Sequence, residues 1–175
     1  MAEAGGLAGG ARPPRPREYD LLSLRIAVTG ADTPVELIRR VGHELPFRAV
    51  ITGYGLTEAG TATATSPADD VETVAATVGR PRPGFELRIV DGHGKDVPAG
   101  APEEVLLRGE SVMSHYLDDR EATAQTLSAN GWLRTGDLGL LDEAGSLRIV
   151  GRVKDMFIVG GFTAYPAEIE RSLAQ

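Results

Sequence analysis

The pattern of apolar and polar positions changes near residue 67. Before it, two short apolar runs, LRIAVTG and FRAVITGYG, end in glycines and predict buried strands. Between them, TPVELIRRVGHEL predicts a helix capped by Thr33 with Pro34 at its first position. The expected inner face of this helix consists of Val35, Leu37, Ile38 and Val41. Strand, helix and strand in this order predict one β-α-β unit with parallel pairing.

After residue 67 the chain consists of short alternating segments separated by Gly- and Pro-containing turns. These segments are FELRIVD, EEVLLRG, GWLRTGDLG and GSLRIVGR, and they predict a small antiparallel β unit. DDREATAQTL predicts one short helix between its strands. The final stretch, YPAEIERSLAQ, predicts the start of another helix with Pro166 near its first turn.

The predicted fold is therefore mixed α/β, in three successive parts. Residues 19–78 form a partial N-terminal α/β subdomain, and residues 79–151 form a small antiparallel, barrel-like β subdomain. Residues 152–175 form a hinge and the start of a small C-terminal α+β domain. Residues 1–18 are mostly Ala, Gly, Pro and Arg, which predicts a disordered arm. The alternative is a basic binding arm that uses Arg12, Arg15 and Arg17.

Composition excludes several classes of protein. Hydrophobic residues make up 42% of the chain and charged residues 25%, as in soluble globular proteins. The net charge of −7 argues against a nucleic-acid partner. The absence of cysteine excludes disulfides, thiol catalysis and thiolate metal sites. The sequence has no apolar run near the ~20 residues of a membrane helix and no signal-peptide core, so we expect a cytoplasmic protein.

The stretch GYGLTEAG, residues 53–60, combines residue types that suit a nucleotide and its metal. Gly53 and Gly55 let a ligand approach the backbone closely. Tyr54 offers a flat face for a planar ring, and Thr57 offers a hydroxyl for a phosphate oxygen. Glu58 offers a hard oxygen ligand for Mg²⁺. The alternative is an ordinary strand-to-loop turn with a partly buried tyrosine.

Three stretches in order, YGLTE, GWLRTGDLG and GRVKDMFIVGGFTAYPAEIE, resemble the adenylate-forming superfamily of acyl-CoA synthetases, luciferases and peptide-synthetase adenylation domains. The last stretch is most similar to those of fatty-acyl-CoA and other carboxylate-CoA ligases, and the resemblance extends from Leu21 to the end of the chain. It implies that a carboxylic acid and ATP form an acyl-adenylate, whose acyl group then passes to coenzyme A. ATP or AMP, Mg²⁺ and coenzyme A are the implied cofactors and co-substrates.

The resemblance also implies roles for single residues in the first half of the chain. Gly30 and Ala31 match a small-residue stretch along the adenine and acyl pocket. Tyr54 matches the aromatic residue that stacks on adenine. Thr57 and Glu58 are the candidate catalytic residues, because they match the α-phosphate hydroxyl and the Mg²⁺ ligand.

In the second half, Asp137 matches the carboxylate that binds the ribose hydroxyls, and Arg152 the arginine that also reaches the ribose. Ile149 matches the apolar neighbour of adenine, and Lys154 falls at the hinge of the small C-terminal domain. Gly160 and Gly161 match a loop along which the pantetheine of coenzyme A runs.

Ordinary structural roles remain open for these residues. For Asp137 the alternative is a turn carboxylate, and for Arg152 it is a surface ion pair with Asp155. For Lys154 the alternative is a solvated turn, and for Gly160 and Gly161 it is a bend in a strand.

Two parts of the family pattern have no counterpart in the 175 residues. One is the Ser/Thr/Gly-rich phosphate loop, and the other is a catalytic lysine, since Lys95 and Lys154 lie in other contexts. We therefore expect an incomplete ligase that does not adenylate alone, with open strand edges that favour a complementing chain or self-association. The alternatives are a non-catalytic AMP- or ATP-binding module and part of an adenylation domain that loads a carrier protein. The residues do not identify the carboxylic acid.

Overall fold

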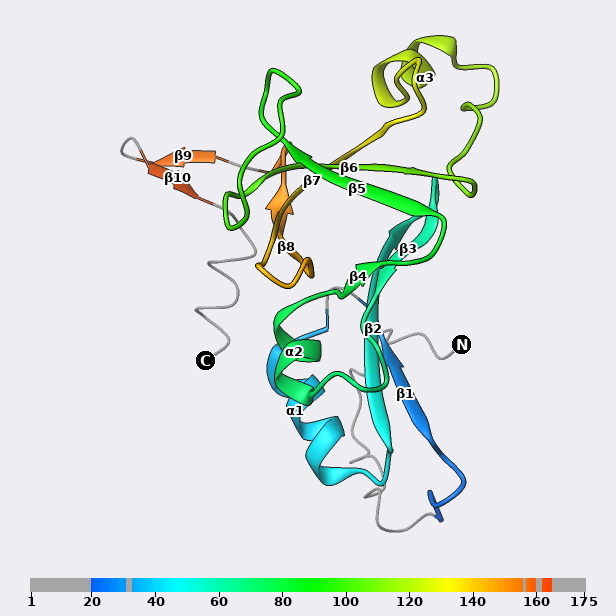
Figure 1. Ribbon diagram of the computed structural model, residues 1–175, viewed down its shortest axis with the longest axis vertical. Helices are drawn as coiled ribbons and strands as arrows, with labels where there is room; N and C mark the ends of the chain where they lie inside the picture. The colour runs from blue at the N-terminus through cyan, green and yellow to red at the C-terminus, as the bar shows by residue number, and fades with distance from the viewer. Residues whose placement is uncertain (1–19, 31–32, 156, 160–161, 165–175) are drawn as a thin grey trace, which may run out of the picture.

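The computed structural model describes residues 20–30, 33–155, 157–159 and 162–164, and its strands form two four-stranded sheets and one hairpin (Figure 1). The arm predicted for residues 1–18 and the helix predicted near the end of the chain lie outside the described residues. No helix in the described part is long and apolar enough to cross a membrane.

The first sheet has the strand order β1-β2-β3-β4. β1 and β2 are parallel and joined through α1, which confirms the predicted β-α-β unit. β3 and β4 add antiparallel strands. The elements of this layer are β1 (Ile26–Thr29), α1 (Val35–Glu44), β2 (Ala49–Leu56), β3 (Gly60–Ala64), α2 (Val71–Ala76) and β4 (Arg80–Pro81).

Three details of this layer differ from the prediction. Pro34 is the N-cap of α1, and no side chain caps the helix, so Thr33 does not have the predicted role. Leu37 is 47% exposed and points outward, whereas Ile38 of the same helix is buried. β1 is a strand but is not buried, since Val28 is 73% exposed. The reason is that β1 is the edge strand of the sheet.

The second sheet has the strand order β5-β6-β7-β8, and every neighbouring pair is antiparallel, as predicted. Its order ends at β5 and β8, so the described strands form an open sheet and not a closed barrel. The helix predicted between its strands is α3. The elements are β5 (Phe85–Val90), β6 (Glu103–Gly109), α3 (Arg120–Thr126), β7 (Leu133–Leu141) and β8 (Leu147–Arg152). An antiparallel hairpin of β9 (Phe157–Val159) and β10 (Phe162–Ala164) follows.

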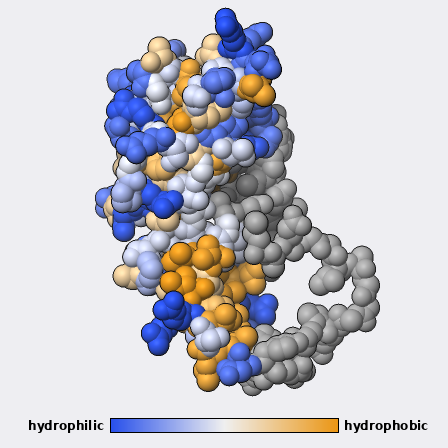
Figure 2. Space-filling view, turned by 90° about the vertical axis from the view of Figure 1, so that its right-hand side faces the viewer, coloured by the Kyte–Doolittle hydropathy of each residue, from blue (hydrophilic) through white to orange (hydrophobic). Residues whose placement is uncertain are grey.

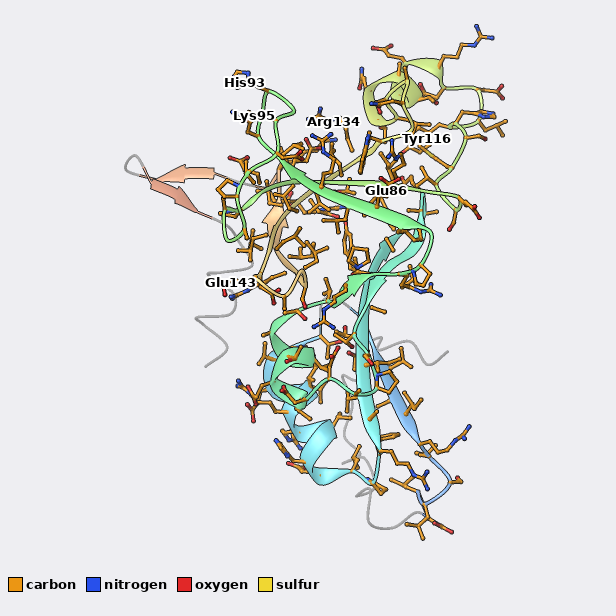
Figure 3. All side chains as sticks on the ribbon, viewed as in Figure 1. Glu86, His93, Lys95, Tyr116, Arg134 and Glu143 are labelled. Carbon is orange, nitrogen blue, oxygen red and sulfur yellow. The ribbon has the colours of Figure 1, made fainter. Side chains whose placement is uncertain are left out.

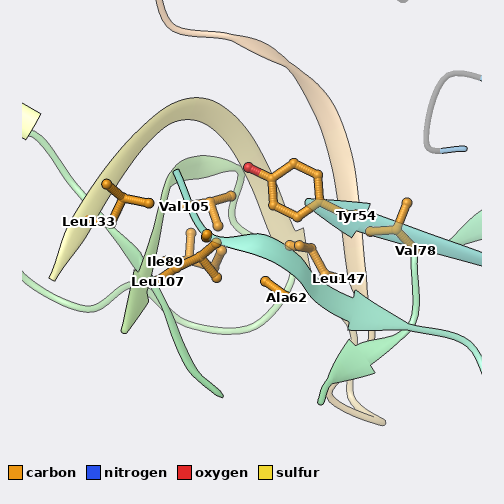
Figure 4. Packing of buried hydrophobic residues seen from close by; sticks show 9 residues of the cluster. Tyr54, Ala62, Val78, Ile89, Val105, Leu107, Leu133 and Leu147 are labelled. Carbon is orange, nitrogen blue, oxygen red and sulfur yellow. The ribbon is translucent and has the colours of Figure 1, made fainter. Parts of the chain in front are cut away.

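The main core lies where the β2–β3 hairpin packs on the second sheet (Figure 4). It is built from inward-facing residues of both parts, which bury apolar surface jointly. Its buried members are Tyr54, Ala59, Ala62, Val78, Ile89, Val105, Leu107, Leu133 and Leu147. A second, smaller cluster between α1, α2 and β2 contains Ile38, Val50 and Val74.

Candidate functional site

The GYGLTEAG stretch is mostly strand. Gly53, Tyr54 and Gly55 lie inside β2, which confirms the strand predicted for FRAVITGYG. A Cβ on Gly55 would come within 2.2 Å of the Gly60 carbonyl oxygen, which shows that glycine is needed for the close approach of β3. The glycines thus allow strand pairing, and ligand approach at their backbone stays a prediction.

Glu58 lies at the tip of the β2–β3 hairpin, in the short loop between Leu56 and Gly60, which are paired residues. Gly60 closes this loop with a φ of +69°, a conformation that favours glycine. Thr57 is exposed in the same loop. Thr57 and Glu58 thus lie in the turn that directly follows β2.

Asp137 is the buried carboxylate of the site. It lies in β7 directly opposite Arg152 of β8, and its side chain is 10% exposed. The Arg152 Nε donates to Asp137 Oδ1 over 2.9 Å, and the Tyr54 hydroxyl donates to Asp137 Oδ2 over 2.6 Å. A carboxylate offers about four acceptor positions, so two remain for another donor. Arg152 therefore pairs with Asp137 and not, as the alternative supposed, only with Asp155.

Tyr54 is 5% exposed, and its ring lies in the main core with the hydroxyl at the edge of the cluster (Figure 4). Burial and the hydrogen bond to Asp137 both raise the pKa of this hydroxyl, so it keeps its proton and donates to the carboxylate. The predicted stacking on adenine stays a prediction, since it needs a ring face that is covered here.

A cleft of about 490 Å³ opens beside the hairpin tip. Three predicted residues line it: Glu58, Arg152 and Lys154. Asp137 does not itself line the cleft. Thr135 and Gly136, which precede it in β7, and its partner Arg152 form the cleft wall in front of it. Other lining residues are Leu56, Glu104, Tyr116, Gln125, Thr126, Arg134, Thr135, Gly136, Val153 and Asp155.

The remaining predicted residues lie elsewhere. Gly30 follows β1, where its carbonyl accepts from the Thr52 hydroxyl over 3.4 Å, and it does not line the cleft. Ile149 packs against the main core from β8. Ala31, Gly160 and Gly161 fall outside the described residues.

Sequence reasoning missed Tyr116, whose hydroxyl donates to Glu58 Oε1 over 2.8 Å. This hydrogen bond raises the pKa of Tyr116 above its ordinary value. Sequence reasoning also missed the ion pair of Arg134 with Glu104 in the cleft wall. In Figure 3, Tyr116 is labelled just below α3 and Arg134 to its left, whereas Lys95 is labelled on the β5–β6 loop. No local signal joins Tyr116 to Glu58, because 58 positions separate them.

The residues present fit a magnesium ion shared with a substrate. The described part of the chain contains no group of three or more potential metal-binding side chains. A single carboxylate beside substrate phosphates is nevertheless an ordinary environment for Mg²⁺. The Tyr116 hydroxyl takes one acceptor position on Oε1 of Glu58, and this bond leaves a second position on Oε1 and both positions on Oε2 for a cation.

Comparison with known proteins shows the family to which the chain belongs. The family model described as "AMP-binding enzyme" matches residues 6–117, more than half of the chain. The match starts within the segment predicted as an arm. A relative from Mycobacterium tuberculosis, named 3-[(3aS,4S,7aS)-7a-methyl-1,5-dioxo-octahydro-1H-inden-4-yl]propanoyl:CoA ligase, is 54% identical over 93% of this chain and 30% of its own length. The chain thus spans less than a third of that relative.

Two solved structures are also similar. The anthranilate CoA ligase AuaEII in complex with anthranoyl-AMP matches with a TM-score of 0.80 and 35% identity, over 90% of this chain and 30% of that one. O-succinylbenzoate Coenzyme A synthetase from Bacillus subtilis, in complex with ATP and magnesium ion, matches with a TM-score of 0.76 and 32% identity, over 85% and 31%. The chain belongs to the AMP-binding enzyme family, as an acyl-CoA synthetase type of the adenylate-forming superfamily.

Proposed function

We propose that this chain forms the ribose- and metal-binding part of an ATP-dependent carboxylate-CoA ligase that works through an acyl-adenylate. The observation that supports this most directly is Asp137, a buried carboxylate with two free acceptor positions beside the cleft that Glu58 lines. The cleft volume of about 490 Å³ lies in the usual range for small-molecule sites.

In this proposal each residue has one task. Asp137 accepts hydrogen bonds from the ribose hydroxyls, while Tyr54 and Arg152 orient its carboxylate. Thr57, exposed in the hairpin loop, donates to the α-phosphate. Glu58 is the protein ligand of Mg²⁺, which when bound neutralises charge on the phosphates. Lys154 lies at the hinge, next to the cleft.

The test compares two nucleotides on two proteins. Calorimetric titration measures the Kd of AMP and of 2′,3′-dideoxy-AMP for the 175-residue chain and for Asp137→Asn. Hydrogen bonds to a charged acceptor contribute about 1.5–3 kcal/mol, so we expect the unaltered chain to prefer AMP by about 10- to 100-fold. Asp137→Asn should lose most of this preference. Equal preference in both proteins would refute the ribose role of Asp137.

Asp96→Asn is the matched control, because Asp96 also pairs with an arginine, Arg88, but lies outside the cleft. This variant should retain the full preference for AMP.

We further propose that the 175 residues bind nucleotide without completing the reaction. The location that we propose is the cytoplasm, where ATP and coenzyme A are available. The chain contains only Lys95 and Lys154 as lysines, and neither has the sequence context of the catalytic cation. Removing one such charge-stabilising group commonly costs 10²–10³ in rate. Formation of AMP and acyl-CoA from ATP, a carboxylic acid and coenzyme A by this chain alone would overturn this part.

The exposed face of β1 supports a proposal about assembly. Leu22, Leu24, Ile26 and Val28 alternate along one segment and are 83%, 42%, 49% and 73% exposed. Such an edge pairs readily with another strand, and we propose a second copy of the chain as its partner. Sedimentation should show a dimer that Val28→Lys dissociates. A monomer at all concentrations would exclude self-association and favour a complementing chain.

A further inference from the structure

The segment from Met113 to Tyr116 contacts Glu58 at two points. The Met113 backbone N–H donates to the Glu58 carbonyl oxygen over 2.7 Å. The Tyr116 hydroxyl donates to the Glu58 Oε1 over 2.8 Å. One contact fixes the backbone of the hairpin tip and the other fixes the carboxylate, so Glu58 has little freedom to rotate away from the cleft.

The position of Tyr116 is itself fixed by the turn that starts α3. The Tyr116 backbone N–H donates to the Thr123 Oγ1 over 3.0 Å, and the Thr123 hydroxyl donates to the Asp119 carbonyl over 2.6 Å. Asp119 also accepts from the Ala122 N–H over 2.9 Å and caps the helix. Asp118 has a φ of 55°, a conformation that non-glycine residues adopt only where the surroundings determine it.

We propose that Tyr116 is a positioning residue that orients Glu58 for a Mg²⁺–nucleotide complex. The proposal rests on the metal role of Glu58 stated above. Side chains that hydrogen-bond a metal ligand typically change metal affinity 10- to 100-fold when they are removed. The hydrogen bond from Tyr116 takes one of the two acceptor positions of Oε1, so Oε2 is the oxygen on which this bond leaves both positions for the cation.

A purely structural role for Tyr116 predicts something different. If Tyr116 only supported the fold, its removal would weaken all nucleotide binding equally, with and without metal. A positioning role predicts loss of the metal-dependent part alone. The two roles are therefore separated by a ratio: the Kd of ATP measured with EDTA, divided by the Kd of ATP measured with saturating Mg²⁺.

The experiment determines this ratio by calorimetric titration of the full 175-residue chain and of four variants. Tyr116→Phe keeps the ring and removes the hydroxyl, and Glu58→Gln removes the charge of the metal ligand. The double variant tests whether Tyr116 acts through Glu58, since coupled residues are not additive. Leu117→Ala is the matched control, because Leu117 lies in the same turn and is 85% exposed. Thermal melts without ligand confirm that each variant folds.

We expect the ratio to be at least about 10 in the unaltered chain and to fall by about tenfold in Tyr116→Phe, the lower limit for such partners. The Kd with EDTA should be unchanged. Glu58→Gln should bring the ratio near 1, and the double variant should lower the ratio no further. Leu117→Ala should give the same ratio as the unaltered chain.

Three results would overturn the inference. In the first, the ratio is unchanged in Tyr116→Phe but falls to about 1 in Glu58→Gln. This result refutes the role of Tyr116 and leaves the proposed function standing. Equal weakening of both Kd values in Tyr116→Phe shows a structural role. A ratio of 1 in the unaltered chain refutes the metal role of Glu58 and the inference with it.

Discussion

The two layers of the molecule bury their apolar side chains very differently. In the second sheet, Val90, Val105, Leu107, Leu133 and Leu147 are all 0% exposed. Among the described residues of the first layer, Ile38, Val50 and Val74 form a small cluster of their own, whereas Tyr54, Ala59 and Ala62 are buried in the core shared with the second sheet. The apolar residues of β1 remain in contact with solvent there, and Figure 2 shows apolar atoms gathered on the lower part of the molecule.

This difference indicates which half positions the site. β2 belongs to both layers, because its first residues pair with β1 and its last residues pair with β3 and pack on the second sheet. Asp137, Arg152 and Tyr116 all lie in or next to the well-packed second sheet. We therefore expect the geometry of the cleft to depend on the second sheet and to tolerate changes in β1.

The largest expected effect is in the main core. Leu107→Ala removes a fully buried side chain and should lower the free energy of unfolding by about 2–5 kcal/mol. Leu37→Ala is the control in the other layer. Leu37 of α1 is 47% exposed, so this variant should lower stability by less than about 1 kcal/mol. Urea denaturation measures both, and similar losses would mean that the layers are equally packed.

A second test compares two glycines assigned to the nucleotide site. A Cβ on Gly55 would meet the Gly60 backbone at 2.2 Å, so Gly55→Ala should cost about 1–3 kcal/mol or more. No atom of the described residues lies within 4 Å of a Cβ on Gly30, so Gly30→Ala should leave stability within about 0.5 kcal/mol. Thermal melts of the two variants measure this contrast. A stable Gly55→Ala variant would mean that β3 can move away from β2.

Much of the architecture could be predicted from local pattern. The alternation in residues 85–90 and 103–109 predicts half-buried strands, and the antiparallel sheet follows. β3 was missed because its sequence, GTATA, contains no large apolar residue. α2 was missed although Asp70 gives a signal, since its side chain accepts from the Thr73 N–H as an N-cap.

The site could be predicted only in part, for a physical reason. Asp137 and Glu58 are distinctive residue types in short motifs, so the sequence indicates them. Their partners are set by tertiary packing: the Tyr54–Asp137 hydrogen bond spans 83 positions and the Tyr116–Glu58 bond spans 58. Trp132 illustrates the same limit, because Arg88 and Arg108 from two other strands stack on its ring.

The next test separates the two partners of Asp137. Asp137→Ala leaves the buried Tyr54 hydroxyl without its acceptor, so we expect a loss of about 1–3 kcal/mol and of AMP binding. Arg152→Ala removes a side chain that is 66% exposed and leaves Asp137 its hydrogen bond from Tyr54, so we expect a smaller loss, of about 1 kcal/mol. Urea denaturation of both variants provides the measurement. An equal loss would show that the pairing of Asp137 with Arg152 stabilises the fold as much as its hydrogen bond from Tyr54.

The smallest expected effect concerns alkaline pH. Because burial and Asp137 raise the pKa of Tyr54, the folded state keeps a proton that the unfolded chain releases above the ordinary tyrosine pKa of 10.0. The stability due to this proton is fully present below that pH and is lost as pH rises toward the raised pKa of the folded state.

Between pH 9 and pH 11 the unaltered chain should lose about 1 kcal/mol more than Tyr54→Phe, since each pH unit contributes at most about 1.4 kcal/mol. Urea denaturation at several pH values measures this difference, and the other tyrosines cancel because both proteins contain them. Parallel pH curves for the two proteins would mean that the Tyr54 hydroxyl is accessible to water in solution.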